Sequence, residues 1–444
     1  MPQNHPVVVI GAGPIGLAAA AELAGRGLDP VVLEAGPHAG AAVREWGHVR
    51  LFSPWSELVS PAAARLLEST GWHRPDGSRY PLGAEWASEY LDPVAAVLGD
   101  RIRFDTRVTG VARRGRDRVV DSGRADQPFT VHAIDTTGAD VRITARAVVD
   151  ASGTWAMPNP LGGDGYPATG ERAASDRISY RIPDLRAPDV RARYAGMGVG
   201  VLGAGHSALT ALVELTALAE SDGTHVTWVL RRGEIGNAFG GGEADQLPAR
   251  GALGRRAHAA VRSGHIDVVT GFRTSAIDKG AGERAVLVGD DGRRLPDVDE
   301  IIGLTGFRPD LSFLSEVRLE LDARLQAPVR LAPLIDPNVH SCGTVYPHGV
   351  NELSHPEPDL YLVGMKSYGR APTFLAMTGY EQVRSVAAAI AGDRESAERV
   401  ELTLPGSGVC GGAGLFDEPD AAKAGGCCGP AESAVLQIGG VRPM

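Results

Sequence analysis

At the start of the chain, an apolar stretch, a glycine-rich stretch and an alanine-rich stretch follow one another. Residues 7–10 form an unbroken apolar run, a glycine-rich stretch follows at 11–16, and small apolar residues then continue to 21. A second apolar run at 31–33 ends in Glu34. Short apolar runs next to glycine favour strands, and the alanine-rich stretch favours a helix. The pattern therefore predicts a strand, a tight turn, a helix and a second strand.

The glycines of this turn have the spacing Gly11-x-Gly13-x-x-Gly16. Gly11 allows a sharp turn, Gly13 leaves room for a pyrophosphate against bare backbone, and Gly16 lets the helix pack closely on the strand. The N-terminus of the helix then faces the phosphates. Glu34 ends the next strand, where its carboxylate can accept hydrogen bonds from a ribose. Together these features predict a dinucleotide-binding unit.

The same pattern recurs in the middle of the chain. A strand predicted at 199–202 leads into a second glycine turn, and the next strand covers 226–230. Arginines stand here where the first unit has Glu34. Guanidinium groups pair with a 2′-phosphate in a forked geometry, whereas a carboxylate would repel it. The second unit should therefore prefer NADP, and its predicted binding residues are Gly203, Gly205, His206, Ser207, Ala208, Arg231 and Arg232.

The remaining pattern completes an α/β chain in which the second unit is inserted into the first. A polar hairpin region at 113–140 indicates an inserted antiparallel sheet. The predicted helices are 61–69, 84–98 and 378–391, and the further predicted strands are 102–108, 147–150, 300–304 and 359–364. We expect two Rossmann-like domains of a three-layer ββα type. The predicted domains are 1–165 with 300–400, then 190–299, and a flexible Gly- and Cys-rich tail at 401–444.

Composition and charge narrow the class of protein. A length of 444 residues with 43% hydrophobic content suits two or three domains with their own cores. A net charge of -10 argues against a nucleic-acid partner. The uncharged run at 194–213 contains five glycines, which suits a nucleotide turn better than a membrane helix. No basic region precedes the first apolar run, so we expect a cytoplasmic protein. The oligomeric state stays open, a homodimer included.

These motifs resemble the two-dinucleotide-binding flavoproteins and, among them, the flavin-containing monooxygenase group. The resemblance rests on the turn at 11–16 with Glu34, the turn at 203–208 with Arg231, and Leu304-Thr305-Gly306-Phe307. It implies FAD on the first unit and NADPH on the second. It also implies that the helix at 378 points its N-terminus at the flavin and stabilises the reduced form. The further residues that it places against FAD are Val108, Gly153 and Gly364.

The chain differs from the proteins that it resembles in two respects, the positions of its cysteines and one monooxygenase sequence pattern. The segment 178–184 lacks the histidine of the monooxygenase pattern Phe-x-Gly-x-x-x-His. The CxxC or CxxxxC pair of related disulfide reductases is also missing, so we do not expect dithiol exchange at the flavin. Instead, Cys410, Cys427 and Cys428 crowd the tail.

Adjacent thiols form only a strained ring, and with a third thiol they suit a soft ion such as arsenic(III) or mercury(II). Together with the motifs at 150–155 (DASGTW) and 364–370 (GMKSYGR), a cysteine-rich end of this kind resembles the flavin monooxygenase-type proteins of arsenic-resistance clusters. Incidental thiols in a disordered end, or a zinc knuckle without its fourth ligand, are the alternatives.

The leading hypothesis is an FAD enzyme that takes hydride from NADPH and uses O2 to oxygenate a soft nucleophile, a sulfur, nitrogen or trivalent arsenic compound. The predicted catalytic residues are Lys366, Tyr368 and Arg370, in a loop that follows a flavin-contacting strand. The other residues expected to line a substrate pocket are Arg50, Phe52, Trp55 and Trp155. Two alternatives stay open: an NADPH-dependent reductase acting on a thiol-bound metalloid, and a metalloid-binding redox sensor.

Overall fold

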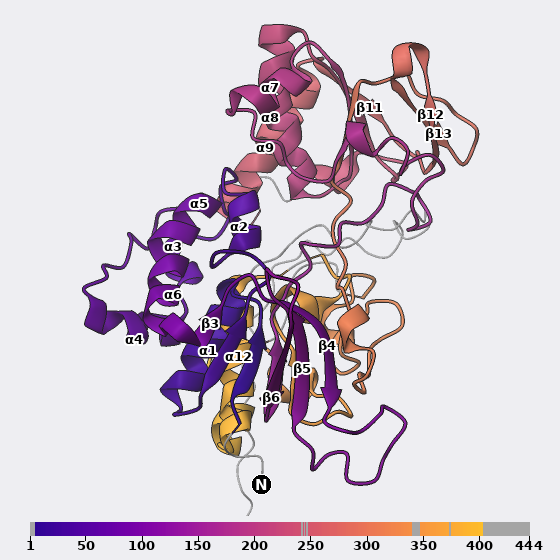
Figure 1. The fold of residues 1–444 in the computed structure, drawn as a ribbon. Coiled ribbons are helices and arrows are strands. Elements are labelled where there is room, and N and C mark those ends of the chain that lie inside the picture. The colour runs from indigo at the N-terminus through magenta and orange to yellow at the C-terminus, as the bar shows by residue number, and fades with distance from the viewer. Residues whose placement is uncertain are drawn as a thin grey trace, which may run out of the picture.

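Two five-stranded parallel sheets organise the chain, one in each of two lobes (Figure 1). The computed structural model describes residues 5–240, 243, 245, 247–339, 347–372 and 374–402. The first sheet has the order β15 (Leu360–Leu362), β7 (Ala147–Asp150), β1 (Val7–Ile10), β2 (Pro30–Leu33) and β3 (Ile102–Arg103). The second has the order β11 (Ile266–Val269), β10 (His225–Val229), β9 (Gly198–Leu202), β14 (Glu300–Gly303) and β8 (Ile178–Ser179).

The first lobe has three layers because its sheet is apolar on both faces. Val7 and Val9 of β1 point into a core shared with helices α1 (Pro14–Gly25) and α12 (Ala376–Ala391). Val8 and Ile10 point the other way, into a core shared with an antiparallel sheet. That sheet consists of β4 (Arg107–Arg113), β5 (Phe129–Ile134) and β6 (Asp140–Ala145). The three-layer ββα architecture is thereby confirmed.

The second lobe repeats the same layering. Val199 and Val201 of β9 pack with helices α8 (His206–Asp222) and α9 (Pro248–Arg262). Leu202 points to the opposite face, where it joins the core under the hairpin of β12 (Thr274–Lys279) and β13 (Ala285–Gly289). The insertion of one Rossmann-like unit into another is therefore visible as two similar lobes.

Two predicted strands differ from the structure. The segment 102–108 divides into β3 and β4, which lie in different sheets, because Asp105 adopts a left-handed conformation (φ +50°) between them. The backbone N–H of Thr106 donates to the carbonyl of Glu34, so this turn docks on the end of β2. The strand at 300–304 pairs with β9 instead of returning to the first sheet, and β8 joins the same sheet. The second sheet thus extends past 190–299 on both sides.

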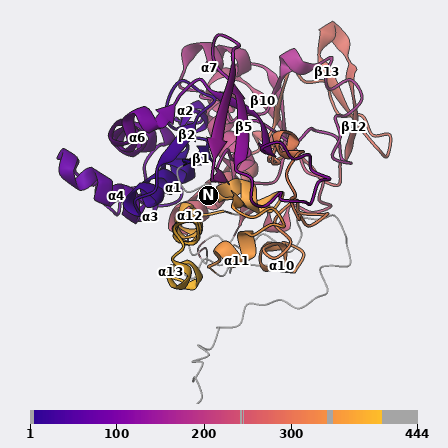
Figure 2. The ribbon, with the colours of Figure 1, turned by 60° about the horizontal axis from the view of Figure 1, so that its bottom comes forward.

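Shorter helices surround the first lobe. The helix expected at 61–69 is α4 (Pro61–Leu67), which is followed by a 3₁₀ turn. The helix expected at 84–98 consists of three pieces: α5 (Gly83–Trp86), a π-helical turn and α6 (Asp92–Leu98). In Figure 2, α13 (Arg394–Glu398) and α11 (Val350–Leu353) lie beside α12. The other short helices of this lobe are α2 (Ala41–Glu45), α3 (Trp55–Leu58) and α10 (Ala332–Ile335). The short helix α7 (Pro188–Tyr194) belongs to the second lobe, where Tyr194 packs in the core (Figure 1).

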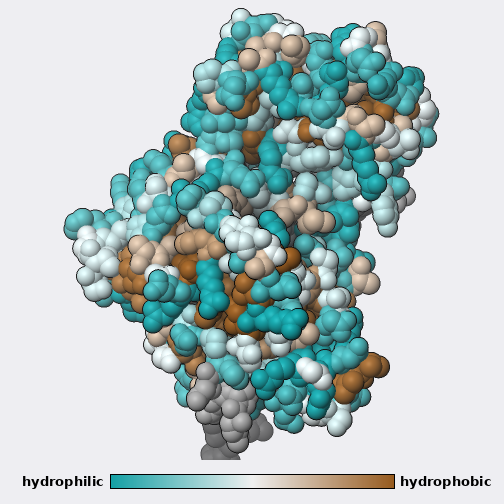
Figure 3. Space-filling model, viewed as in Figure 1, coloured by the Kyte–Doolittle hydropathy of each residue, from teal (hydrophilic) through white to brown (hydrophobic). Residues whose placement is uncertain are grey.

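The surface is mixed in character. On the face seen in Figure 3, the upper lobe is mostly hydrophilic and hydrophobic residues show mainly over the lower lobe. The most exposed large apolar side chains, Val119, Tyr166 and Val339, lie in three separate loops. Within the described ranges, no helix is both long enough and apolar enough to cross a membrane.

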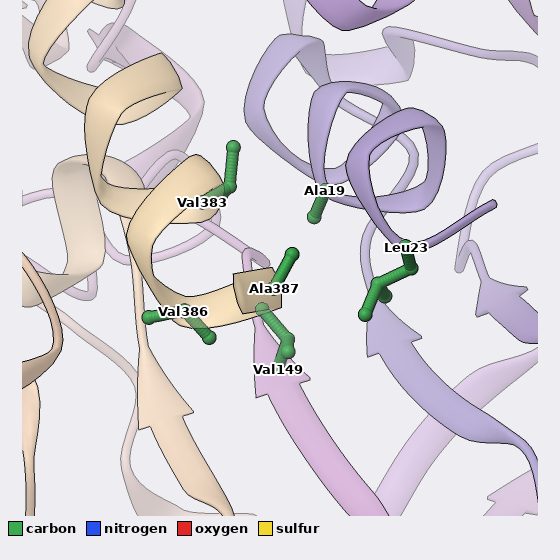
Figure 4. A pocket seen from close by; sticks show the side chains of 6 residues that line it. All are labelled: Ala19, Leu23, Val149, Val383, Val386 and Ala387. Carbon is green, nitrogen blue, oxygen red and sulfur yellow. The ribbon is translucent and has the colours of Figure 1, made fainter. Parts of the chain in front are cut away.

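Figure 4 shows the place where α1, α12 and β7 meet, which has no room for a water molecule. Its lining consists of core side chains only: Ala19, Leu23, Val149, Val383, Val386 and Ala387. Because none of them carries a polar group and no water-sized space remains, this place is part of the hydrophobic core.

Candidate active site

The first glycine turn has the geometry of a phosphate cradle. Gly11 has φ +97°, and a Cβ there would lie 2.9 Å from the carbonyl oxygen of Ala151, so the position requires glycine. A Cβ on Gly16 would lie only 1.9 Å from the carbonyl oxygen of Gly11, whereas a Cβ on Gly13 would meet nothing within 4 Å. Since Gly13 directly precedes α1, bare backbone and free helix N–H groups face the open space.

Glu34 stands beside this turn, as the sequence predicts. Its Oε2 accepts a hydrogen bond from the N–H of Ala12 (2.6 Å), and its Oε1 accepts one from the N–H of Gly36 (2.8 Å). Burial raises the pKa of the Glu34 carboxyl, and these two hydrogen bonds counteract that rise. The carboxylate is thus held at the end of β2, where a ribose would lie.

Three further predicted residues lie around the same edge of the first sheet. Gly153 (φ +69°) follows β7 and leaves open space where a Cβ would stand. Gly364 (φ +68°) follows β15, and a Cβ there would approach Ile15 of α1 to within 3.1 Å. Val108 lies on β4, just after the turn that contacts Glu34. The carboxyl ends of parallel strands are where ligands bind in such sheets, so Gly153 and Gly364 lie where a cofactor is expected. Val108 belongs to the antiparallel sheet and is brought near Glu34 by the preceding turn.

Lys366 is fully buried in an ion pair. Its Nζ lies 2.6 Å from Oδ2 of Asp150, which is also 0% exposed, and donates a hydrogen bond to Oγ of Ser152 at 2.9 Å. The ammonium group also lies 4.2 Å from the centre of the Phe313 ring. Asp150 in turn accepts hydrogen bonds from the N–H and hydroxyl of Ser152. Lys366 thereby fastens the 3₁₀ segment Gly364–Tyr368 to the turn after β7.

The other two predicted catalytic residues have different surroundings. The Tyr368 ring is buried and packs edge-on against Phe374 at 5.0 Å. Burial raises the pKa of Tyr368 far above its usual range, which makes it a poor acid at neutral pH. Arg370 is exposed, and its Nε donates to Oε1 of Gln326 at 2.8 Å. In the structure, therefore, only Arg370 of this set faces solvent.

The second glycine turn repeats the cradle. Gly203 has φ +135°, and a Cβ there would lie 2.2 Å from the carbonyl oxygen of Leu304. A Cβ on Gly205 would meet nothing within 4 Å, and α8 begins at the next residue. Trp228 fixes the turn by donating its Nε1–H to the carbonyl of Gly203 at 2.8 Å. Ala208 is fully buried at the place of the third glycine.

The predicted NADP residues surround this cradle. His206 packs edge-on against Phe52 of the first lobe at 5.5 Å. Burial, then the charge of Arg250, lower the pKa of His206 to about 4, so the imidazole is neutral at neutral pH. Ser207 is exposed in the first turn of α8. Arg231 and Arg232 follow β10, and Arg231 is exposed with no ion pair in the described part of the chain.

A cluster at the lobe junction was only partly anticipated. The Trp155 ring stacks against Phe307 at 4.9 Å, and its Nε1 donates to Glu45 of α2 at 2.7 Å. The Arg181 guanidinium lies 3.9 Å from the Trp155 ring centre. Of these residues, the sequence predicts only Trp155 as part of a substrate pocket. The order of the strands brings the residues after β7, β8 and β14 together, and that order is not readable from the sequence. Of the other expected pocket residues, Trp55 is fully buried in the core.

The predicted thiol ligands Cys410, Cys427 and Cys428 lie outside the described residues. In the ranges that the structure does cover, no three His, Cys, Asp or Glu residues are arranged to hold a metal ion.

Two glycine turns of similar geometry, one in each lobe, are typical of chains that bind two dinucleotides. The sequence matches the model of the pyridine nucleotide-disulphide oxidoreductase family over residues 8–330. The chain belongs to this family, and the protein is an oxidoreductase. None of the proteins with curated functions matches the sequence.

Solved structures with the same fold include disulfide reductases and monooxygenases. Bacillithiol disulfide reductase Bdr from Bacillus cereus is 20% identical over 87% of this chain and 99% of that chain, with a TM-score of 0.64. The FAD-bound cadaverine monooxygenase DfoA from Erwinia amylovora is 15% identical over 90% and 98%, with a TM-score of 0.61. A flavin-containing monooxygenase from Stenotrophomonas maltophilia is 23% identical over 87% and 98%, with a TM-score of 0.54. These likenesses confirm the predicted two-dinucleotide flavoprotein fold and support FAD as its cofactor.

Proposed function

We propose that the protein is an FAD- and NADPH-dependent monooxygenase that oxygenates a soft nucleophile, a sulfur, nitrogen or trivalent arsenic compound. The observation that carries the assignment of the two cofactors is the contrast at the strand ends. A hydrogen-bonded carboxylate, Glu34, ends β2, and an exposed guanidinium, Arg231, follows β10. A carboxylate suits the ribose of FAD, and a guanidinium suits the 2′-phosphate of NADP.

The residues of the first lobe fit FAD. Bare backbone at Gly13 and the start of α1 would hold its pyrophosphate, and Glu34 would hold a ribose. Gly153 and Gly364 leave the backbone of two neighbouring turns accessible to the ring system. Bound flavin supplies hydride acceptance from the nicotinamide and electron transfer to O2. The N-terminus of α12 would stabilise negative charge on the reduced ring.

The chemistry of the cysteines supports oxygenation over dithiol exchange. The chain has four cysteines, and no two of them have the CxxC or CxxxxC spacing. The turn after β7 carries Ser152 and Thr154, and the one after β15 carries Lys366, which holds Ser152 through a hydrogen bond. A sequence without either spacing lacks the paired thiols through which related reductases pass electrons from flavin to a disulfide, and this supports O2 as the acceptor.

The decisive experiment follows the fate of isotopically labelled O2. We would incubate the holoenzyme with NADPH, labelled O2 and either an aryl methyl sulfide or arsenite. A monooxygenase transfers one labelled oxygen atom to the product for each NADPH consumed. Release of peroxide alone, whatever compound is added, would refute the proposal. NADPH-dependent reduction of an added disulfide without O2 would favour a reductase.

We further propose that Cys410, Cys427 and Cys428 bind arsenic(III) for this enzyme, because three thiolates suit a soft ion. The double variant Cys427→Ser, Cys428→Ser should lose arsenite binding, measured by equilibrium dialysis. The variant Cys342→Ser is the matched control and should bind as the wild type does. Unchanged binding by the double variant would contradict the assignment.

A further inference from the structure

A buried polar network ties the turn after β15 to α12. It contains Gln382 of α12, Ser367 of the segment Gly364–Tyr368, and His348, which precedes α11. Gln382 and Ser367 are 0% exposed and His348 is 2% exposed. Burying a polar side chain costs free energy unless the side chain is hydrogen-bonded. The partners of these three residues therefore show what the network holds in place.

The Gln382 amide has three partners. Its Oε1 accepts a hydrogen bond from the backbone N–H of Gly364 at 2.7 Å. Its Nε2 donates to Oγ of Ser367 at 2.9 Å and lies 2.8 Å from Nε2 of His348. A backbone N–H can only donate, so the amide oxygen must face Gly364 and the NH2 group must face the other two partners. The nitrogen of His348 that faces Gln382 is therefore the acceptor, and the amide has one orientation.

Ser367 holds the other polar group of Gly364. Its Oγ donates to the carbonyl oxygen of Gly364 at 2.8 Å while it accepts from Gln382. Gln382 thus fixes the N–H of Gly364 directly and its carbonyl through Ser367. Gly364 has φ +68°, a conformation that glycine enters and leaves easily because it has no Cβ. Contacts from other residues must therefore keep the backbone of Gly364 in this conformation.

The turn at Gly364 also packs closely on two helices. A Cβ on Gly364 would lie 3.1 Å from Cγ1 of Ile15, and a Cβ on Gly379 of α12 would lie 2.4 Å from Cδ1 of the same side chain. Ile15 lies in the first turn of α1, just after the first glycine turn. A shift of Gly364 would therefore displace the starts of α1 and α12, the two helix ends that the proposed function directs at FAD.

We propose that Gln382 is a positioning residue for the flavin, because its amide fixes the backbone of Gly364 in the conformation that faces the cofactor. The assignment rests on the FAD site of the proposed function and is independent of the reaction with O2. Only an amide suits this place. A carboxylate has no N–H to donate to Ser367 and His348, and an apolar side chain offers no acceptor to the N–H of Gly364.

The experiment compares two variants of the network with a matched control on the same helix. Gln382→Met removes the amide at nearly equal volume, and Ser367→Ala removes only the hydroxyl. The control is Ser385→Ala, because Ser385 is 1% exposed and equally hydrogen-bonded to backbone. Its Oγ accepts from the N–H of Val350 at 2.9 Å and donates to the carbonyl of Ala397 at 2.6 Å. These bonds join α12 to α11 and α13.

Three properties of each holoenzyme are measured without NADPH: the rate of FAD release on dilution, the visible circular dichroism of the bound flavin, and thermal unfolding. Gln382→Met should release FAD about tenfold faster, near the upper end of what one hydrogen bond contributes. Ser367→Ala should release it about threefold faster, because the bond from Gln382 to Gly364 remains. Both should change the flavin dichroism. Ser385→Ala should unfold at a lower temperature but match the wild type in FAD release and dichroism.

FAD release and dichroism like those of the wild type in both network variants would overturn the assignment. An equally fast release from Ser385→Ala would overturn it as well, because the effect would then follow from lost stability alone. If Gln382→Met does not fold, Ser367→Ala decides between the same outcomes. The labelled-oxygen experiment is separate: the expected changes in FAD release, without any oxygenated product from the wild type, would support the role of Gln382 and refute the monooxygenase alone.

Discussion

The turn after β1 and the turn after β9 begin alike and end differently. In both turns, a glycine with positive φ lies against a backbone carbonyl at the end of the neighbouring strand. That carbonyl belongs to Ala151 in the first turn and to Leu304 in the second. In both, the next glycine leaves open space before a helix. The third position differs, since Gly16 has no room for a methyl group whereas Ala208 is accommodated and fully buried. The shared part has the geometry expected for a pyrophosphate site, and the two turns differ in how closely the third position is packed.

The strands beside the turns differ more strongly. Ile10 at the end of β1 is paired with Asp150, which forms the buried ion pair with Lys366. Leu202 at the end of β9 is paired with Gly303, which packs against the apolar side chains of Leu161 and Tyr180. The first cradle is thus supported by charge and the second by apolar contact. This difference predicts how the two lobes respond to substitution.

The largest expected effect is at Lys366. Lys366→Met leaves Asp150 as an unpaired buried carboxylate, so the free energy of unfolding should fall by about 3–5 kcal/mol. Urea denaturation of the holoenzyme measures this loss. The double variant Asp150→Leu, Lys366→Met should recover much of it. A Lys366→Met protein of normal stability that no longer turns over would instead make Lys366 catalytic.

The next effect concerns nucleotide choice. Arg231→Glu should weaken NADPH binding about tenfold to a hundredfold and leave NADH binding almost unchanged, because only NADPH carries the 2′-phosphate. Anaerobic flavin reduction at varied nucleotide concentration measures both. Arg262→Glu, at the exposed end of α9, is the control for charge alone. Equal losses for NADPH and NADH would show that Arg231 does not face the phosphate.

The third position of the turns gives a smaller effect. Gly16→Ala should destabilise the protein by about 1–3 kcal/mol, since its Cβ would lie 1.9 Å from a backbone oxygen. Ala208→Gly, the reciprocal change in the second turn, should cost about 1 kcal/mol through helix propensity alone. Thermal unfolding and FAD content report on both. A Gly16→Ala protein as stable as Ala208→Gly would mean that the first turn is no tighter than the second.

The smallest effect is a pH dependence in the second turn. Folding lowers the pKa of His206 from 6.5 to about 4, so His206 is neutral in both states above pH 6.5. As the pH falls from 6.5 toward 4, the unfolded chain takes up the proton first, and stability is lost across that window. His206→Gln should flatten this part of the curve of unfolding free energy against pH. His355, whose pKa is also lowered to about 4, is present in both proteins and contributes equally to both curves. A curve that does not change in the variant would therefore contradict the burial of His206.

Local features of the sequence determined both cradles. The spacing of the glycines dictates where the backbone can adopt positive φ. In such units, the residue that selects the ribose or the 2′-phosphate follows the turn by about twenty residues, and Glu34 and Arg231 stand at that position. These relations span about twenty residues and need no knowledge of the rest of the fold. For that reason the fold class and the family resemblance could be predicted and are confirmed.

The tertiary structure alone decided which distant segments meet. An apolar strand has the same pattern in either sheet, so the placement of β14 and the division of 102–108 followed from hydrogen bonding at the sheet edges. Lys366 is a charged loop residue in the sequence and becomes a buried structural cation only because Asp150 ends the adjacent strand. Burial and charge pairing depend on contacts between residues far apart in the chain, and only the folded arrangement of the strands creates those contacts.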